Sequence, residues 1–143
     1  MIELALLQAR ENEGPHSVYL RFIVLAPRRR RGLGLFRADT WLLDDPTLPE
    51  WLRRPIDEHF AWFNEHLPMP RNASRRTRLP PAAICWFRPQ AHDHIARARE
   101  LAWLIDEAGH PTAMVKTRRV GDVIYRDDFQ VVAKPEASTR LSV

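Results

Sequence analysis

The sequence predicts an α+β fold, in which a small, mainly antiparallel sheet of three or four strands carries two principal helices on one face. Three observations favour this class. A strand-like run lies early in the chain at residues 17–27, two helical patterns occupy the middle, and two strand-like runs follow at 112–118 and 122–135. Strands and helices do not alternate regularly, as they would around a parallel sheet.

The size and composition of the chain describe one domain with a buried core. It has 143 residues, of which 45% are hydrophobic and 28% charged, and a chain of this length buries most of its apolar surface. We expect residues 1–16 to form an N-terminal extension or edge strand, residues 17–134 the α+β domain, and residues 135–143 a flexible tail.

The same composition predicts a cytoplasmic protein that has no membrane partner. Cys85 is the single cysteine, so the chain cannot form an internal disulfide. No segment has the length of apolar sequence that a membrane span needs, and the start of the chain does not read as a secretory signal.

The run at residues 17–27, "SVYLRFIVLAP", predicts a strand that is covered on both sides. Its β-branched and aromatic residues are dense, and Pro27 ends it. One face would carry Val18, Leu20, Phe22 and Val24, and the other Tyr19, Arg21, Ile23 and Leu25. Apolar alternation at residues 2–6 predicts a preceding strand, paired with this one as a hairpin.

Two helices are expected after a short helix at residues 35–43. Apolar residues at three- and four-residue spacing predict the first: Leu52, Ile56, Phe60, Phe63 and Leu67. Pro55 requires that helix either to start near it or to kink there. A proline-rich loop at residues 67–81 and a short strand or helix lead-in at 83–89 separate it from the clearest helix, at 90–109, which Gly109 ends.

The two closing runs are expected to pair through a hairpin at "RVGD", residues 119–122. In the second run, "DVIYRDDFQVVAKP", the odd positions would face one way, with Asp127 as the polar exception. A buried carboxylate needs a partner, and Arg21 is the candidate. Asp127, Tyr125 and Arg21 are therefore the candidate catalytic residues of a small enzyme. The alternative is that residues 126–128 bend the chain and Asp127 points to water.

Arginine is concentrated in two clusters. Residues 1–90 hold 14 basic and 10 acidic side chains. The candidate nucleic-acid or anion-binding residues are Arg28, Arg29, Arg30, Arg31, Arg71, Arg75, Arg76 and Arg78. Guanidinium groups neutralise phosphates whatever the base sequence, so nucleic acid is a possible partner if the fold brings the clusters together.

The segment "PRRRRGLG" does not predict a nucleotide site. Its Gly-x-Gly pattern has Arg37 where the third glycine of a dinucleotide fingerprint would stand, and no parallel strand–helix–strand unit follows. The remaining alternative is a solvated or protein-contacting turn at the end of a buried strand.

Metal and thiol chemistry have weaker support. Among the histidines, His92 and His94 lie close together, and His59 and His66 are seven residues apart, but a second ligand pair with zinc-site spacing is missing. We expect no metal and no cofactor. Cys85 with His92 or His94 is the one nucleophile pairing available, and a small buried residue is the simpler interpretation of Cys85.

Three segments carry a family resemblance: "HFAWFNEHLPMP", "ICWFRPQA" and "GDVIYRDDFQVVAKP". Together they resemble small uncharacterised bacterial proteins that combine a "WFN" helix, a "WF" segment and a C-terminal Tyr-x-Asp-x-x-Gln-Val-Val strand. The resemblance covers residues 17–135. It implies a shared fold and no particular activity.

These observations favour a small binding or accessory protein that acts through contacts with a protein partner, as an inhibitor or regulator. A nucleic-acid-binding module that uses the two arginine clusters is the alternative. An enzyme built on the Asp127 cluster ranks third.

Overall fold

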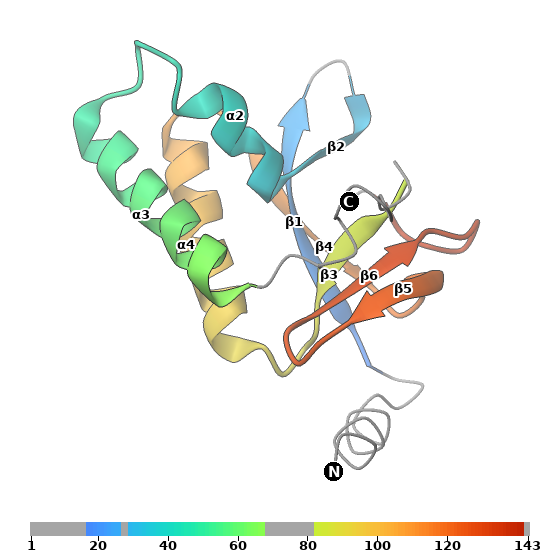
Figure 1. The fold of residues 1–143 in the computed structure, drawn as a ribbon. Helices are drawn as coiled ribbons and strands as arrows, with labels where there is room; N and C mark the ends of the chain where they lie inside the picture. The colour runs from blue at the N-terminus through green and yellow to red at the C-terminus, as the bar shows by residue number, and fades with distance from the viewer. Residues whose placement is uncertain (1–16, 27–28, 68–81, 142–143) are drawn as a thin grey trace, which may run out of the picture.

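A computed structural model describes residues 17–26, 29–67 and 82–141. Two long helices lie side by side on one face of a twisted sheet, and a short helical segment joins them to its first two strands (Figure 1). The elements are β1 (Tyr19–Ala26), β2 (Arg29–Gly34), the 3₁₀ turn η1 (Leu35–Ala38), α2 (Asp39–Leu42), α3 (Glu50–His66), β3 (Ile84–Phe87), α4 (His92–Glu107), β4 (Thr112–Thr117), β5 (Asp122–Arg126) and β6 (Gln130–Lys134). The α+β class is confirmed.

The sheet has six strands in the described chain, so the expectation of three or four was too low. All its pairings are antiparallel. β1 lies at the centre: β4 pairs along one edge, because Ile23 is opposite Ala113. The other edge is shared by β2, where Ile23 is opposite Gly34, and by β3, where Leu20 is opposite Phe87. β6 and then β5 continue the sheet beyond β3.

Both faces of β1 are buried, as its alternation predicts. Phe22 and Val24 join the cluster that lies between the sheet and the helices. Tyr19 and Ile23 join a second cluster on the opposite face, around Trp86. The two clusters explain why this strand is apolar on both sides.

The two long helices are confirmed, and the start of α3 excludes one of the two alternatives at Pro55. The apolar stripe of α3, from Leu52 to Leu67, is buried. The helix starts at Glu50, with Pro49 as its N-cap residue, and Pro55 lies inside it. Pro55 has no N–H to donate to the carbonyl of Trp51, which costs the helix one bond without ending it. Gly109 follows α4 with a φ of 95°, the left-handed conformation that suits a helix stop.

Three expectations about strands were wrong. β4 does not form a hairpin with β5, because its partner is β1. The run at 122–135 is two strands, since the chain turns between Arg126 and Gln130 and β5 pairs with β6. The arginine segment is not a turn after a strand, because residues 29–34 form β2 and pair with β1. The expected strand near residues 2–6 and most of the proline-rich loop lie outside the described residues.

None of the helices in the described residues has the length and apolar character needed to span a membrane.

Candidate functional site

Two tryptophans stand out on the surface of the helix layer. Trp51 on α3 is 66% exposed and Trp103 on α4 is 60% exposed. Each directly precedes a buried leucine, Leu52 in α3 and Leu104 in α4. Each indole therefore points away from the sheet, while the neighbouring leucine packs into the core. Exposed apolar side chains that fall on one surface are candidates for contact with a partner.

The two tryptophans belong to one surface, because α3 and α4 are neighbouring antiparallel helices. Contacts pair His59 with Glu100, Trp62 with Arg97, and His66 with His94. Extending this register places Trp51 and Trp103 about five residues apart along the helix axes, or about 7–8 Å at 1.5 Å per residue. The axes of packed helices are about 8–10 Å apart. We call the surface of α3 and α4 turned away from the sheet, which carries Trp51, Trp62 and Trp103, the outer helix face.

A hollow of about 300 Å³ opens on the outer helix face. Its lining is Trp62, Asp93, Ala96, Arg97 and Glu100. The guanidinium carbon of Arg97 lies 4.9 Å from the centre of the Trp62 ring, a cation–π contact. The His66 ring stacks on the same indole at 4.3 Å. The Trp62 ring is thus fixed between α4 and the end of α3, and the hollow is bordered by rigid groups.

Hydrogen bonds fix the histidines beside the hollow. His66 Nδ1 lies 2.8 Å from the carbonyl of Trp62, and His94 Nε2 lies 2.7 Å from the carbonyl of His66. A carbonyl only accepts, so each of these ring nitrogens carries a proton. His94 also stacks on Phe129 at 4.2 Å. The His94 ring therefore ties α4 to α3 and to the β5–β6 turn, while the His66 ring is held against its own helix.

His59 is the buried histidine of this interface. Its Nε2 is 3.4 Å from the carboxylate of Glu100, while its Nδ1 is buried without a hydrogen-bond partner in the described residues. Burial lowers the pKa of His59, although the charge of Glu100 opposes that effect. The ring is consequently neutral at neutral pH, and Glu100 keeps its negative charge on the surface.

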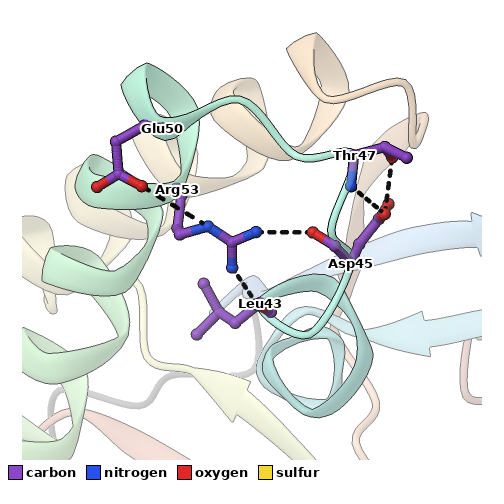
Figure 2. Close-up of polar contacts among 5 residues, drawn as sticks. All are labelled: Leu43, Asp45, Thr47, Glu50 and Arg53. Atoms are coloured by element: carbon purple, nitrogen blue, oxygen red, sulfur yellow. Dashed lines mark hydrogen bonds and ion pairs between the residues drawn. The ribbon is translucent and has the colours of Figure 1, made fainter.

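The start of α3, where Trp51 emerges, is held by Arg53 (Figure 2). Arg53 donates hydrogen bonds to the carbonyl oxygens of Leu43 and Asp45, the second at 2.7 Å. The Asp45 carboxylate accepts from the backbone N–H and the hydroxyl of Thr47, at 2.9 and 2.7 Å. These bonds satisfy carbonyls at the end of α2 and fix the turn into α3.

We expect Arg53→Ala to lower the free energy of unfolding by about 1–2 kcal/mol, because two carbonyls lose a charged donor at a partly exposed site. Urea unfolding followed by circular dichroism measures this. The matched control is Arg54→Ala, one position along on an exposed part of α3, for which we expect a change within about 0.5 kcal/mol. Equal losses in the two variants would contradict the role of Arg53.

The exposed surface of the helix layer is acidic. α3 and α4 carry eight acidic and four arginine side chains, although the whole chain has a formal net charge of +4. All eight carboxylates are exposed: Glu50, Asp57, Glu58, Glu65, Asp93, Glu100, Asp106 and Glu107. Two of the four arginines, Arg53 and Arg97, are half-buried. The rest of the chain holds 18 basic and 10 acidic residues, so the charges are segregated.

The side chains of the two arginine clusters lie outside the described part of the structure. Arg29, Arg30 and Arg31 have their backbone in β2, which places them one after another along an edge strand. Arg28 and the cluster from Arg71 to Arg78 are not described. That the two clusters share one face stays a prediction.

The structure brings Tyr125 and Asp127 together in a polar network with Gln130. The Tyr125 hydroxyl donates to Asp127 Oδ2 at 2.9 Å, and Gln130 Nε2 donates to the same oxygen at 2.9 Å. Asp127 Oδ1 accepts from the backbone N–H groups of Phe129 and Gln130, at 2.8 and 2.9 Å. Asp127 thus caps the turn between β5 and β6, the local bonding typical of aspartate in turns.

A buried arginine connects this turn to β3. Arg88 is 2% exposed, and its guanidinium donates to the carbonyl of Asp127 at 2.8 Å. Its backbone N–H donates to the carbonyl of Phe129 at 2.9 Å. The carboxylate and the carbonyl of Asp127 are therefore both engaged in holding the turn.

Arg21 does not complete the predicted catalytic cluster. The described residues show no hydrogen bond or ion pair between Arg21 and Asp127. A Cβ at Gly34 would come within 3.4 Å of the Arg21 guanidinium, which therefore lies against the end of β2. Burial lowers the pKa of Arg21, while the nearby thiol of Cys85 acts in the opposite direction.

Cys85 extends the network as a proton donor. Its Sγ lies 2.9 Å from Gln130 Oε1. Burial raises its pKa to about 12, so the thiol is protonated at neutral pH and is a poor nucleophile. His94 directs its Nε2 to a backbone carbonyl, and in the described part of the chain neither His92 nor His94 contacts Cys85.

Tyr125 supplies a pH-dependent test of the network. Burial, the hydrogen bond to Asp127 and its charge raise the pKa of Tyr125 to about 12. The folded state therefore holds this proton where the unfolded chain, with an ordinary tyrosine pKa near 10, has lost it. We expect the stability contribution to be complete below pH 10 and to fall as pH rises through 12. In Tyr19→Phe only Tyr125 titrates, and ultraviolet titration of tyrosinate should show the high pKa.

Asp127→Asn in the Tyr19→Phe background is the companion variant. It removes the negative charge beside the phenol, so we expect the Tyr125 pKa to move back towards about 10. An unchanged pKa would contradict the contact with Asp127.

The histidines that the structure describes do not assemble a metal site. Across the described ranges, no group of three or more His, Cys, Asp or Glu side chains is placed to hold a metal ion. The rings of His66 and His94 contact Trp62, and their nitrogens lie against backbone carbonyls. His59 lies beside Glu100 instead.

Sequence reasoning missed the outer helix face, because it considered the apolar stripe of each helix and not the side chains on the opposite side. Helical phase supplies the missing signal. Trp51 directly precedes the Leu52 stripe of α3, and Trp103 falls between Ala102 and Leu104 on the opposite side of α4. The angular position of each side chain around its helix axis would have separated these two indoles from the buried apolar stripe.

Comparison with known proteins supplies no relative: no family model matches the chain, and no curated protein or solved structure is significantly similar to it. The function must therefore be inferred from the chemistry of the surface and of the buried network.

Proposed function

We propose that this chain is a protein-binding module, and that the outer helix face is the surface that contacts the partner. The single observation that carries this proposal is the exposure of Trp51 and Trp103 on neighbouring helices. Tryptophan is enriched among the residues that dominate binding energy, since it buries a large apolar ring and still offers an N–H.

The rigidity of the surface supports the proposal. Arg53 fixes the turn before Trp51, and Trp62 is held between Arg97 and His66. Side chains already ordered in the free protein lose less entropy on binding. The Asp127 network offers no comparable case for an enzyme, because its carboxylate is committed to the turn and Cys85 is a protonated thiol.

The test is site-specific cross-linking in the native host. A photoreactive phenylalanine analogue at position 51 or 103 should capture a protein partner, and the same residue at position 123, an exposed position on β5, should not. Capture of the same partner from position 123 alone would overturn the proposal.

We expect Trp51→Ala and Trp103→Ala each to weaken binding of the captured partner by about 10-fold or more, as truncation of a central aromatic anchor does. Both side chains are exposed, so the change in the free energy of unfolding should stay within about 0.5 kcal/mol. Isothermal titration and thermal unfolding measure the two effects. The matched control, Val123→Ala, should leave the affinity unchanged.

Nucleic acid is the alternative partner, and charge segregation favours it for a different surface. The chain outside α3 and α4 carries 18 basic and 10 acidic residues, and such a surplus attracts phosphates. Affinity for DNA or RNA that falls steeply with salt and is lost when Arg28, Arg29, Arg30 and Arg31 become alanine would support this function. Nucleic-acid binding would replace protein binding as the proposed function if Trp51→Ala and Trp103→Ala bound the captured protein with unchanged affinity.

A further inference from the structure

We propose that the partner segment is a basic amphipathic helix that lies along the outer helix face, and this inference rests on the function proposed above. A third helix can pack on a two-helix layer that exposes large aromatic side chains, with its own apolar side chains against Trp51, Trp62 and Trp103.

The spacing of the tryptophans fits a helical occupant. Trp51 and Trp62 are eleven residues apart on α3, or about 16 Å at 1.5 Å per residue. Trp103 lies between them in the register of the two helices. An incoming helix of about three turns covers this length and presents anchors at three- and four-residue spacing.

Charge complementarity determines the sign of the charge that the partner carries. All eight carboxylates of α3 and α4 are exposed, against two exposed arginines, Arg54 and Arg99. Arg53 is occupied by two carbonyls and Arg97 by the Trp62 ring, so the helices present an excess of negative charge. An acidic or phosphate-bearing partner would meet this surface with like charge, which costs affinity and slows encounter. A helix with Lys or Arg beside its apolar stripe meets opposite charge on both sides.

The hollow beside Trp62 suits one long basic side chain. Its lining holds two carboxylates, Asp93 and Glu100, and one cation, Arg97, which already lies over the Trp62 ring. The hollow therefore has an excess of negative charge, and a Lys or Arg that entered it would place its methylene stem against the apolar atoms of the lining and its charge near the two carboxylates. The neutral His59 leaves the charge of Glu100 in place at neutral pH.

A second copy of this chain is not the occupant. A two-fold dimer through the outer helix face would place the same eight carboxylates opposite one another. Docking a basic part of one copy onto the acidic helices of the next would be head-to-tail, which leads to open filaments unless the rotation closes. A separate protein with a basic helix satisfies the charges without either consequence.

The experiment uses two synthetic helical peptides of equal length and the same leucine pattern, one with lysine and one with glutamate at the polar positions. The full chain carries ¹⁵N-labelled tryptophan, and single Trp→Phe variants assign each indole N–H signal. We expect the lysine peptide to shift the signals of Trp51, Trp62 and Trp103 and to leave that of Trp86, which is fully buried, in place. The glutamate peptide should bind at least about 10-fold more weakly.

A charge variant completes the test. Asp93→Asn combined with Glu100→Gln should weaken binding of the lysine peptide by about 3–10-fold. Asp122→Asn combined with Asp128→Asn, exposed on β5 and on the β5–β6 turn, should leave that binding unchanged. Equal binding of both peptides, no binding of the lysine peptide, or shifts confined to other tryptophans would overturn the inference. Cross-linking from position 103 to an acidic or neutral segment would also overturn it while leaving the proposed protein-binding function intact, and failure of cross-linking would remove that function itself.

Discussion

Gly121→Ala is expected to destabilise the fold by at least about 3 kcal/mol, because this residue combines an unfavourable backbone angle with a steric clash. Its φ is 95°, and a Cβ atom would lie 2.1 Å from the carbonyl oxygen of Lys134 and 2.9 Å from the backbone nitrogen of Glu136. Both neighbours are backbone atoms, so no side-chain rotation relieves the contact. Urea unfolding of the purified variant measures the loss, and a chain that fails to fold is consistent with it.

Gly109→Ala is the matched control. Its φ is also 95°, but nothing lies within 4 Å of the position that a Cβ would occupy. We therefore expect only the conformational cost of placing alanine in the left-handed region, about 1 kcal/mol. The difference between the two variants reports the clash with β6, and equal losses would show that Gly121 is not in close contact with Lys134.

Local periodicity was sufficient to predict the helices and the central strand. The spacing from Leu52 to Leu67 and the sequence of residues 90–109 indicated which face of each helix is buried. Residues on one face of a helix recur every three or four positions, so the pattern is complete within one segment of the chain. The dense apolar run of β1 likewise indicated burial on both sides.

Pairing between distant segments could not be predicted in the same way. β4 is close in sequence to β5, yet it pairs with β1, about ninety residues earlier in the chain. The pairing of β4 with β1 depends on the two hydrophobic clusters that pack on the two faces of the sheet. These clusters exist only in the assembled core. The split of residues 122–135 into two strands depends on Asp127, whose side chain can either follow the alternation or bond its own backbone.

The candidate site shows the same limit. Tyr125 and Asp127 were predicted to act together, and the structure places both in one network with Gln130. Arg21 was paired with Asp127 on the argument that a buried carboxylate needs a cation. The carboxylate instead accepts from amides and a phenol, which supply the same stabilisation without a charged partner.

Asp127→Ala is expected to lower the free energy of unfolding by about 3 kcal/mol, since it leaves several donors without an acceptor. The backbone N–H groups of Phe129 and Gln130 lose Oδ1, and the side chain of Gln130, which is 2% exposed, loses Oδ2. The lost hydrogen bonds lie in the turn between β5 and β6, which Arg88 also holds. We therefore expect the β5–β6 hairpin to unfold locally before the rest of the domain. Hydrogen exchange of the amides of β5 and β6 locates the effect, and chemical denaturation gives its size.

Two conservative variants separate a structural role of Asp127 from a catalytic one. Asp127→Asn keeps an oxygen for both backbone amides and loses the oxygen that accepts from Gln130 and from the Tyr125 hydroxyl, so it should cost about 1–2 kcal/mol. Tyr125→Phe removes one hydrogen bond and should cost about 1 kcal/mol. If Asp127 acts through structure, partner binding at the outer helix face should survive in both variants in proportion to the folded fraction. A loss of function in Asp127→Asn with the fold intact would instead require the carboxylate charge itself, and would return the network to consideration as a reactive site.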